Sequence, residues 1–255
     1  MTVAGHLGEL RRRVVLCAVV FVAASVLCFV FIQRFVDAAL ALSTGFDFVY
    51  LSPSELLTSY MKLALILGLV ASSPVLLWQA WAFIQPGLTE REARSARSAI
   101  VAGFVFFLLG IVFCYVLILP LTLQFLYNFN GSLDIAANIS FNSYMSFVLG
   151  MLLAFGVVFE MPVLSFLLSR LGLLRSEWLA KGRKYAVLII FILAALITPP
   201  DVLSQLMTAV PMLALYELSV FVSRAAYRQR ESLEDEEEGE DEEGPEAGQE
   251  KKTDS

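Results

Sequence analysis

Six long apolar runs constrain the fold of this chain more than any other feature. They cover residues 14–32, 61–84, 99–119, 144–168, 185–197 and 202–222. The first four are long enough to cross the roughly 30 Å hydrocarbon core of a bilayer as helices. In addition, 58% of the 255 residues are hydrophobic and the mean hydropathy is +0.74, which is too apolar for a soluble domain of this length. The sequence therefore predicts an all-α, polytopic membrane protein with six transmembrane helices.

The fifth and sixth runs differ from the others. The fifth has 13 residues and would cover only about 20 Å as a helix. The sixth contains Pro211 and the polar residues Gln205 and Glu217, and only Thr198–Asp201 separates it from the fifth. We expect a short helical hairpin, which either thins the bilayer locally or is sheltered by neighbouring helices.

The acidic C-terminus differs in composition from the rest of the chain. Residues 231–255 contain 13 acidic residues and two lysines, a net charge of −11, whereas residues 1–230 carry +5. Such a density of like charge without apolar periodicity is typical of a solvated extension. We therefore expect a six-helix membrane domain over residues 1–230 and a disordered acidic cytoplasmic tail over residues 231–255.

Basic residues gather on one side of the predicted spans. Only Arg34 and Lys62 flank one side, whereas the other 16 of the 18 lysines and arginines fall on the side of the two termini. Lysine and arginine in short loops are kept in the cytoplasm. We therefore expect a multi-pass protein of the cytoplasmic membrane with both termini cytoplasmic.

The chain offers little for catalysis or cofactor binding. His6 is the only histidine, so a two-histidine metal site is excluded, and no GxxxxGK phosphate loop is present. An intramembrane enzyme would need a nucleophile with a base, or a metal centre, and the sequence supplies neither. We expect no enzyme activity, no metal or other cofactor and no nucleic-acid partner.

Three short segments have the form of a helix-capping box, in which a Ser or Thr cap is followed three residues later by an acid. In each case the box predicts a helix start and offers a structural role for its acid. The segments are Ser52–Glu55, Thr89–Glu92 and Thr198–Asp201.

Five motifs follow one another along the chain: HLGELR at His6–Arg11, SPSE at Ser52–Glu55, SSPVLLWQAWAFIQPGL at Ser72–Leu88, AFGVVFEMP at Ala154–Pro162 and TPPDVLSQ at Thr198–Gln205. In this order and at these spacings, the chain resembles the TatC family, the multi-spanning C subunit of the twin-arginine protein translocase. The resemblance extends over almost all of residues 5–223.

The resemblance implies a fold and a function. The fold would be six helices in a concave, glove-like bundle. The function would be to bind the twin-arginine signal peptides of folded cargo proteins at the cytoplasmic face, as receptor and core of the translocase. Single-span subunits of the TatA and TatB type would join it in an oligomeric complex, and the proton-motive force would drive export.

Paired signal arginines held at a membrane surface require carboxylates in fork-to-fork geometry. The resemblance selects Glu9 and Glu92 for this role, with Phe83 as an apolar neighbour and with His6 and Arg11 beside Glu9 in the same motif. Structural alternatives exist for both acids. Glu92 could serve only in its capping box, and Glu9 could pair with a following arginine, Arg12 or Arg13, on its own helix.

Glu160 lies about 15 Å inside the predicted membrane boundary at Arg170. A charge there is costly, so such residues usually face protein or water and have a role. Pro162 removes one helical hydrogen bond and favours a bend. The resemblance implies a polar anchor for a partner's transmembrane helix, for which we also select Gln205 and Asp201. The structural alternative for Glu160 is a hydrogen bond to a neighbouring helix.

The main functional alternative is an ion-coupled secondary transporter of small solutes. Such a protein would also use intramembrane Glu160, Gln205 and broken helices, but many transporters of this class contain an internal repeat. No repeat relates the two halves of this sequence.

Overall fold

The computed structural model describes the backbone of residues 3–43, 47–84, 90–130 and 138–243, and the side chains of residues 8–43, 48–83, 98–128 and 139–229. The chain is almost entirely helical within these ranges. The helices are α1 (Val3–Val30), α2 (Ile32–Leu40), α3 (Pro53–Ile84), α4 (Glu90–Phe113), α5 (Leu119–Asn130), α6 (Phe141–Arg170), α7 (Ser176–Ile197) and α8 (Val202–Glu243), and a π-helical turn, Cys114–Ile118, joins α4 to α5.

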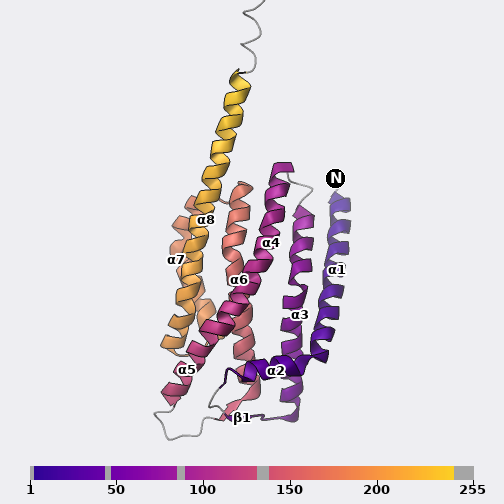
Figure 1. Cartoon of the computed structure of the whole chain (residues 1–255), viewed down its shortest axis with the longest axis vertical. Helices are drawn as coiled ribbons and strands as arrows, with labels where there is room; N and C mark the ends of the chain where they lie inside the picture. The colour runs from indigo at the N-terminus through magenta and orange to yellow at the C-terminus, as the bar shows by residue number, and fades with distance from the viewer. Residues whose placement is uncertain (1–2, 44–46, 85–89, 131–137, 244–255) are drawn as a thin grey trace, which may run out of the picture.

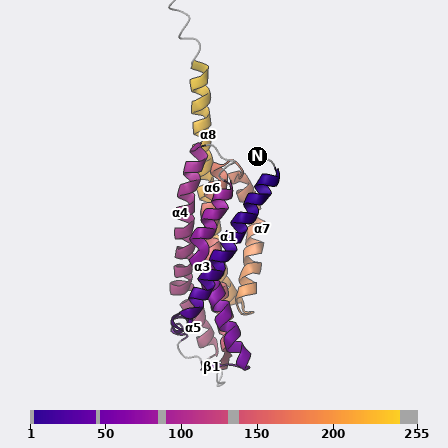
Figure 2. The same ribbon diagram turned by 90° about the vertical axis from the view of Figure 1, so that its right-hand side faces the viewer.

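The long helices run along one direction, and α2 lies across one end of the bundle (Figures 1 and 2). Helix α6 is at the centre, where it packs against α3, α4 and α8. Helix α1 packs on α3, and α7 packs on α8. The buried core follows α6, with Met145, Met151 and Phe155 each 1% exposed or less. The predicted all-α, polytopic class is confirmed.

Five stretches are long and apolar enough to cross a membrane: Gly8–Val30, Pro53–Phe83, Ser98–Asn128, Phe141–Arg170 and Val202–Gln229. They contain the third, fourth and sixth predicted spans and all but the last one or two residues of the first and second. Helix α7 contains the predicted fifth span but does not meet this criterion, although it has 22 residues. Its first turns contain Glu177, Lys181 and Arg183, so only its second half is apolar.

The last two helices are longer than the sequence predicts. Helix α7 begins nine residues before the predicted fifth span, and α8 continues through Pro211 without interruption. The predicted tail begins at residue 231, yet the helix continues to Glu243. Glutamate has a high helix propensity, which is compatible with this extension. Residues 244–255 of the predicted tail lie outside the described part of the chain.

A two-stranded parallel sheet, which the sequence did not predict, closes the end of the bundle near α2. Strand β1 (Asp47–Val49) pairs with β2 (Asn138–Ser140), and Phe48 lies opposite Ile139. Glu55 in the first turn of α3 reinforces the connection, because it accepts hydrogen bonds from the Ser140 hydroxyl, from the Asn142 N–H at 3.3 Å and from the Leu51 N–H at 2.6 Å. The acid of the first predicted capping box therefore also ties α3 to the start of α6.

Candidate functional site

The two ends of the bundle differ in charge. The basic end, as we call it, holds the start of α1, the ends of α3 and α6, and the starts of α4 and α7 (Figure 1). The opposite end holds α2, the small sheet and the α7–α8 turn. Ten described basic side chains belong to the basic end: Arg11, Arg12, Arg13, Arg170, Arg175, Lys181, Arg183, Lys184, Arg224 and Arg228.

Glu9 lies at the basic end as part of a cluster that joins two helices. Its Oε1 accepts hydrogen bonds from Arg13 Nε at 3.1 Å and from Arg13 Nη2 at 2.5 Å. Arg13 Nη1 also donates to Gln79 Oε1 of α3 at 3.0 Å. The side chains of Arg13 and Glu9 are 22% and 30% exposed. The intrahelical partner that the sequence offered for Glu9 is therefore present, and Gln79 holds that partner from the neighbouring helix.

The other residues of the predicted signal-peptide site are only partly described. Arg11 is exposed on α1, and Phe83 is half-buried near the end of α3. The side chains of His6 and Glu92, together with the capping box that contains Glu92, lie outside the described side chains. Gln79 was missed by the sequence prediction, although it is the polar residue between Trp78 and Trp81 in an otherwise apolar run.

Glu160 lines a pocket of about 110 Å³ between α3, α4 and α6. Its Oε1 is buried, as is the Nε1 of Trp81, which lines the same pocket, and neither atom has a hydrogen-bond partner within the described part of the chain. Gly103 leaves room for the carboxylate, because a Cβ at this position would lie 2.9 Å from Glu160 Oε2. The structural hydrogen bond considered for Glu160 is therefore not formed by Oε1 within the described residues.

The remaining polar residues selected from the sequence lie elsewhere. Pro162 is buried in α6, which continues on both sides of it. Asp201 Oδ1 accepts from the Ser204 N–H at 2.7 Å, which caps α8, and Gln205 Nε2 donates to the Phe191 carbonyl at 3.0 Å. Thr198 ends α7 instead of capping α8, so this predicted capping box is wrong. The reason is that Asp201 itself takes the cap position.

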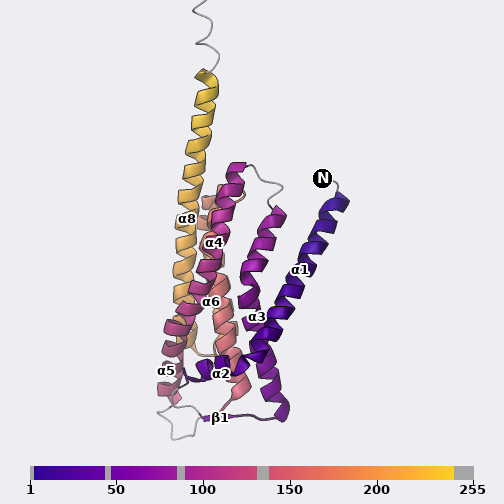
Figure 3. The same cartoon turned by 45° about the vertical axis from the view of Figure 1, so that its right-hand side comes forward.

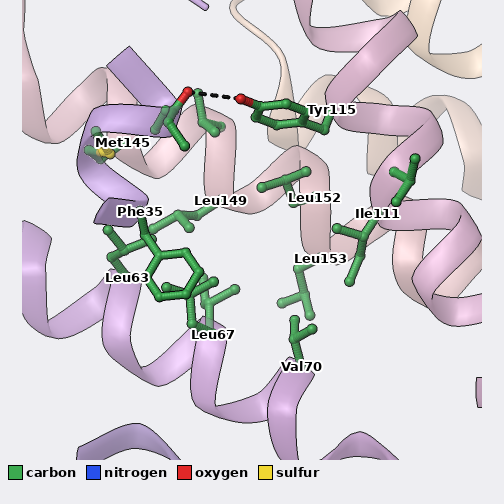
Figure 4. Close-up of a pocket in the computed structure, with 15 residues that line it drawn as sticks. Phe35, Leu63, Leu67, Val70, Ile111, Tyr115, Met145, Leu149, Leu152 and Leu153 are labelled. Carbon is green, nitrogen blue, oxygen red and sulfur yellow. Dashed lines mark hydrogen bonds between the residues drawn. The ribbon is translucent and has the colours of Figure 1, made fainter. Parts of the chain in front are cut away.

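A larger pocket of about 270 Å³ is lined almost only by apolar side chains of α2, α3, α4 and α6 (Figure 4). Tyr115 lies at its edge and donates a hydrogen bond to the Ala38 carbonyl at 3.0 Å. Phe35, Leu67 and Leu152 line the pocket. None of its lining residues carries a charged side chain. Within the described residues, no group of three or more His, Cys, Asp or Glu side chains could hold a metal ion.

Comparison with known proteins agrees with this architecture. The family model described as Sec-independent protein translocase protein (TatC) matches residues 5–211. A protein of that name from Carboxydothermus hydrogenoformans is 37% identical over 227 residues, which are 88% of this chain and 93% of the relative. The TatCy protein of Bacillus subtilis is 37% identical over 235 residues, with 89% and 91% of the two chains covered.

A solved structure has the same fold. The crystal structure described as the twin-arginine translocase receptor TatC superposes with a TM-score of 0.79 at 37% identity, and covers 87% of this chain and 99% of the other. The family model matches most of the chain. The sequence identity of the relatives and of the solved structure is also high enough to indicate a shared family and not only a shared fold. The chain therefore belongs to the TatC family of Sec-independent protein translocase proteins.

Proposed function

We propose that this chain is the receptor and core subunit of a twin-arginine translocase, and that its basic end receives the signal peptides of folded cargo proteins. The observation that carries the proposal is the Glu9–Arg13–Gln79 cluster in a chain of this family. The cluster presents the partly exposed carboxylate of Glu9 at one end of the bundle. Arg13 binds this carboxylate and is itself held by Gln79 of a second helix.

The chemistry of this cluster fits a guanidinium ligand. A guanidinium group binds a carboxylate through two parallel N–H···O bonds. Arg13 uses only Oε1 of Glu9, so a signal arginine can bind Oε2 or replace Arg13, which keeps its bond to Gln79. Glu92 is proposed as the second carboxylate, with Phe83, His6 and Arg11 completing the site.

The charge asymmetry of the bundle supports a cytoplasmic basic end. Arg34 and Lys62 are the only basic side chains of the opposite end within the described residues, and basic residues favour the cytoplasmic side. In this orientation both termini are cytoplasmic. The proposed complex includes TatA- and TatB-type single-span subunits, and the proton-motive force drives export.

The pocket at Glu160 is the proposed contact for a single-span partner. A buried acceptor on Glu160 and a buried donor on Trp81 line one pocket without partners among the described residues. Unpaired polar groups in a membrane interior are costly. A polar side chain on a partner helix could hydrogen-bond to either group, and would gain specificity from doing so.

Signal-peptide binding by the purified protein tests the receptor function directly. A fluorescent twin-arginine peptide should bind the wild-type chain in detergent, and Glu9→Gln or Glu92→Gln should each weaken binding by about tenfold, because a charge-assisted bond is lost and water competes for part of it. A peptide with two lysines should also bind more weakly, because an ammonium group lacks the planar fork.

Glu177→Gln is the matched control. Glu177 lies at the same end, is exposed, and also pairs with a basic residue four positions later, Lys181. The same charge is therefore removed outside the proposed site, and affinity should stay within about twofold of wild type. Wild-type affinity in both Glu9→Gln and Glu92→Gln would remove these residues from the recognition site.

A further inference from the structure

A second polar pocket lies at the basic end, apart from the cluster at Glu9. It has a volume of about 390 Å³ between the start of α7 and the last described turns of α8. This volume is within the range of small-molecule sites. Its lining residues are Arg175, Ser176, Glu177, Arg224, Tyr227 and Arg228.

The pocket has an excess of unpaired positive charge. Arg175, Arg224 and Arg228 have no hydrogen-bond or ion-pair partner among the described residues. The one acid of the pocket, Glu177, pairs with Lys181 at 3.4 Å. Within the described side chains, three guanidinium groups therefore share a space with a single carboxylate that is already paired, which is the arrangement that binds phosphate groups.

The start of α7 adds to this preference for an anion. Arg175 occupies the cap position of this 22-residue helix, and no side chain caps its first N–H groups. The free N–H groups of a helix start and the helix dipole both favour a negative charge. The helix start and the three arginines are separate features that select the same kind of ligand.

The walls of the pocket are held in place by contacts between helices. The Ser169 and Ser223 hydroxyls are hydrogen-bonded at 2.6 Å, which joins α6 to α8. The Tyr216 hydroxyl donates to the Leu179 carbonyl at 2.7 Å, which joins α8 to α7. A site whose walls are already positioned loses less entropy when a ligand binds.

The pocket lies where two apolar stretches end, which is the level expected for lipid headgroups. Two apolar stretches end beside it, one at Arg170 and the other at Gln229. Trp178 and Leu173 next to the pocket are 59% and 65% exposed, and tryptophan is enriched at the membrane–water interface. A ligand in the pocket can therefore keep its apolar part in the bilayer.

We propose that this pocket binds the phosphodiester headgroup of an anionic phospholipid. The arginines and the start of α7 bind the phosphate, and the acyl chains lie along the exposed apolar surface of α7. Basic pockets between transmembrane helices have the chemistry for such headgroups. This site goes beyond the receptor function and does not depend on it.

Native mass spectrometry of the full chain in detergent, with phosphatidylglycerol or phosphatidylcholine added, tests the proposal. The first phosphatidylglycerol should bind more tightly than phosphatidylcholine. Arg224→Gln combined with Arg228→Gln should weaken it by about tenfold, because two charge-assisted contacts are lost. Replacing both arginines by lysine should have an intermediate effect, because the charge remains and the fork is lost.

The matched control is Arg12→Gln combined with Lys184→Gln, which removes the same charge at the same end from residues that do not line the pocket. Its affinity should stay within about twofold of wild type. Equal weakening in the control and the pocket variant would overturn the proposal, as would equal affinity for the two lipids in wild type. The comparison of the two lipids uses only the wild-type chain, so its result does not depend on whether a variant folds.

Two further measurements distinguish a lipid headgroup from the other anions that could occupy the pocket. Inorganic phosphate that displaces the lipid at equal concentration would identify a free phosphate site instead. A chain truncated after residue 230 lacks all 13 acidic residues of the C-terminal segment. If only this truncated chain binds phosphatidylglycerol, the chain's own acidic residues occupy the pocket, and the lipid assignment is wrong.

Discussion

At the scale of single residues, polar atoms inside the bundle are placed by their neighbours on other helices. Glu160 is an example, because its carboxylate fits beside α4 only where Gly103 has no side chain. Arg13 is another, because it binds both Glu9 and a glutamine 66 residues away. The role of each side chain therefore depends on helix packing as much as on its own chemistry.

Changes at Glu160 should alter association with single-span partners. We expect Glu160→Ala to weaken their co-purification by about three- to eighteenfold, because interhelical hydrogen bonds in membranes contribute about 0.6–1.7 kcal/mol. Glu160→Gln should have a smaller effect, because an amide can still form hydrogen bonds. The measurement is the amount of partner retained by the purified, correctly inserted chain.

Leu164→Ala is the control for the Glu160 variants, since Leu164 lines the same pocket, is 50% exposed and has no polar atom in its side chain. It should retain the partner. If Glu160→Ala retains as much partner as Leu164→Ala, the pocket is not the contact site. An equal loss with Ala and Gln would indicate that Glu160 acts through its charge or its proton.

At the scale of elements, α1 is attached to the bundle through a close contact with α3. The two helices come closest toward the end where α2 begins (Figure 3). Only 6% of the apolar stretch of α1 is buried, so few contacts other than those with α3 hold this helix in place. Gly68 makes the approach possible, since a Cβ at this position would lie 2.6 Å from the Ser25 Cα.

Gly68→Ala should therefore push α1 away from α3. Overpacking of this kind typically costs about 1–3 kcal/mol, and the clash involves backbone, which cannot rotate away. We expect a lower thermal unfolding midpoint in detergent and weaker cross-linking between cysteines placed on the two helices. Gly150→Ala is the control, because its nearest neighbour would be Ile197 at an ordinary 3.5 Å. Equal stability of the two variants would contradict the close contact.

At the scale of the whole molecule, the two ends of the bundle should lie on different sides of the membrane. Cysteines can report this in a chain whose native Cys17, Cys28 and Cys114 are replaced by alanine. Leu51→Cys lies at the opposite end and is 81% exposed, so an impermeant thiol reagent should label it in intact cells. Ser255→Cys should react only after the cells are opened. The reverse pattern would overturn the proposed orientation.

The local character of the chain could be predicted from its sequence. Hydropathy is a property of each segment, so the apolar runs, the helical class and the basic end follow from composition and spacing alone. The five motifs between His6 and Gln205, taken together in their order and spacing, similarly pointed to the family. Local signals were less reliable at helix ends, where Thr198 and Asp201 compete for one cap, and where Glu243 instead of residue 222 ends the last helix.

The tertiary structure alone decided which side chains meet. Hydropathy specifies that a helix crosses the membrane but leaves its rotation open, and rotation is set by packing against helices that are distant in sequence. Arg13 and Gln79, Glu55 and Ser140, and Trp81 and Glu160 are pairs or pocket neighbours of this kind. The three arginines that line the pocket beside α7 also come from two helices. Their convergence depends on how α7 and α8 pack, for which no single segment contains a signal.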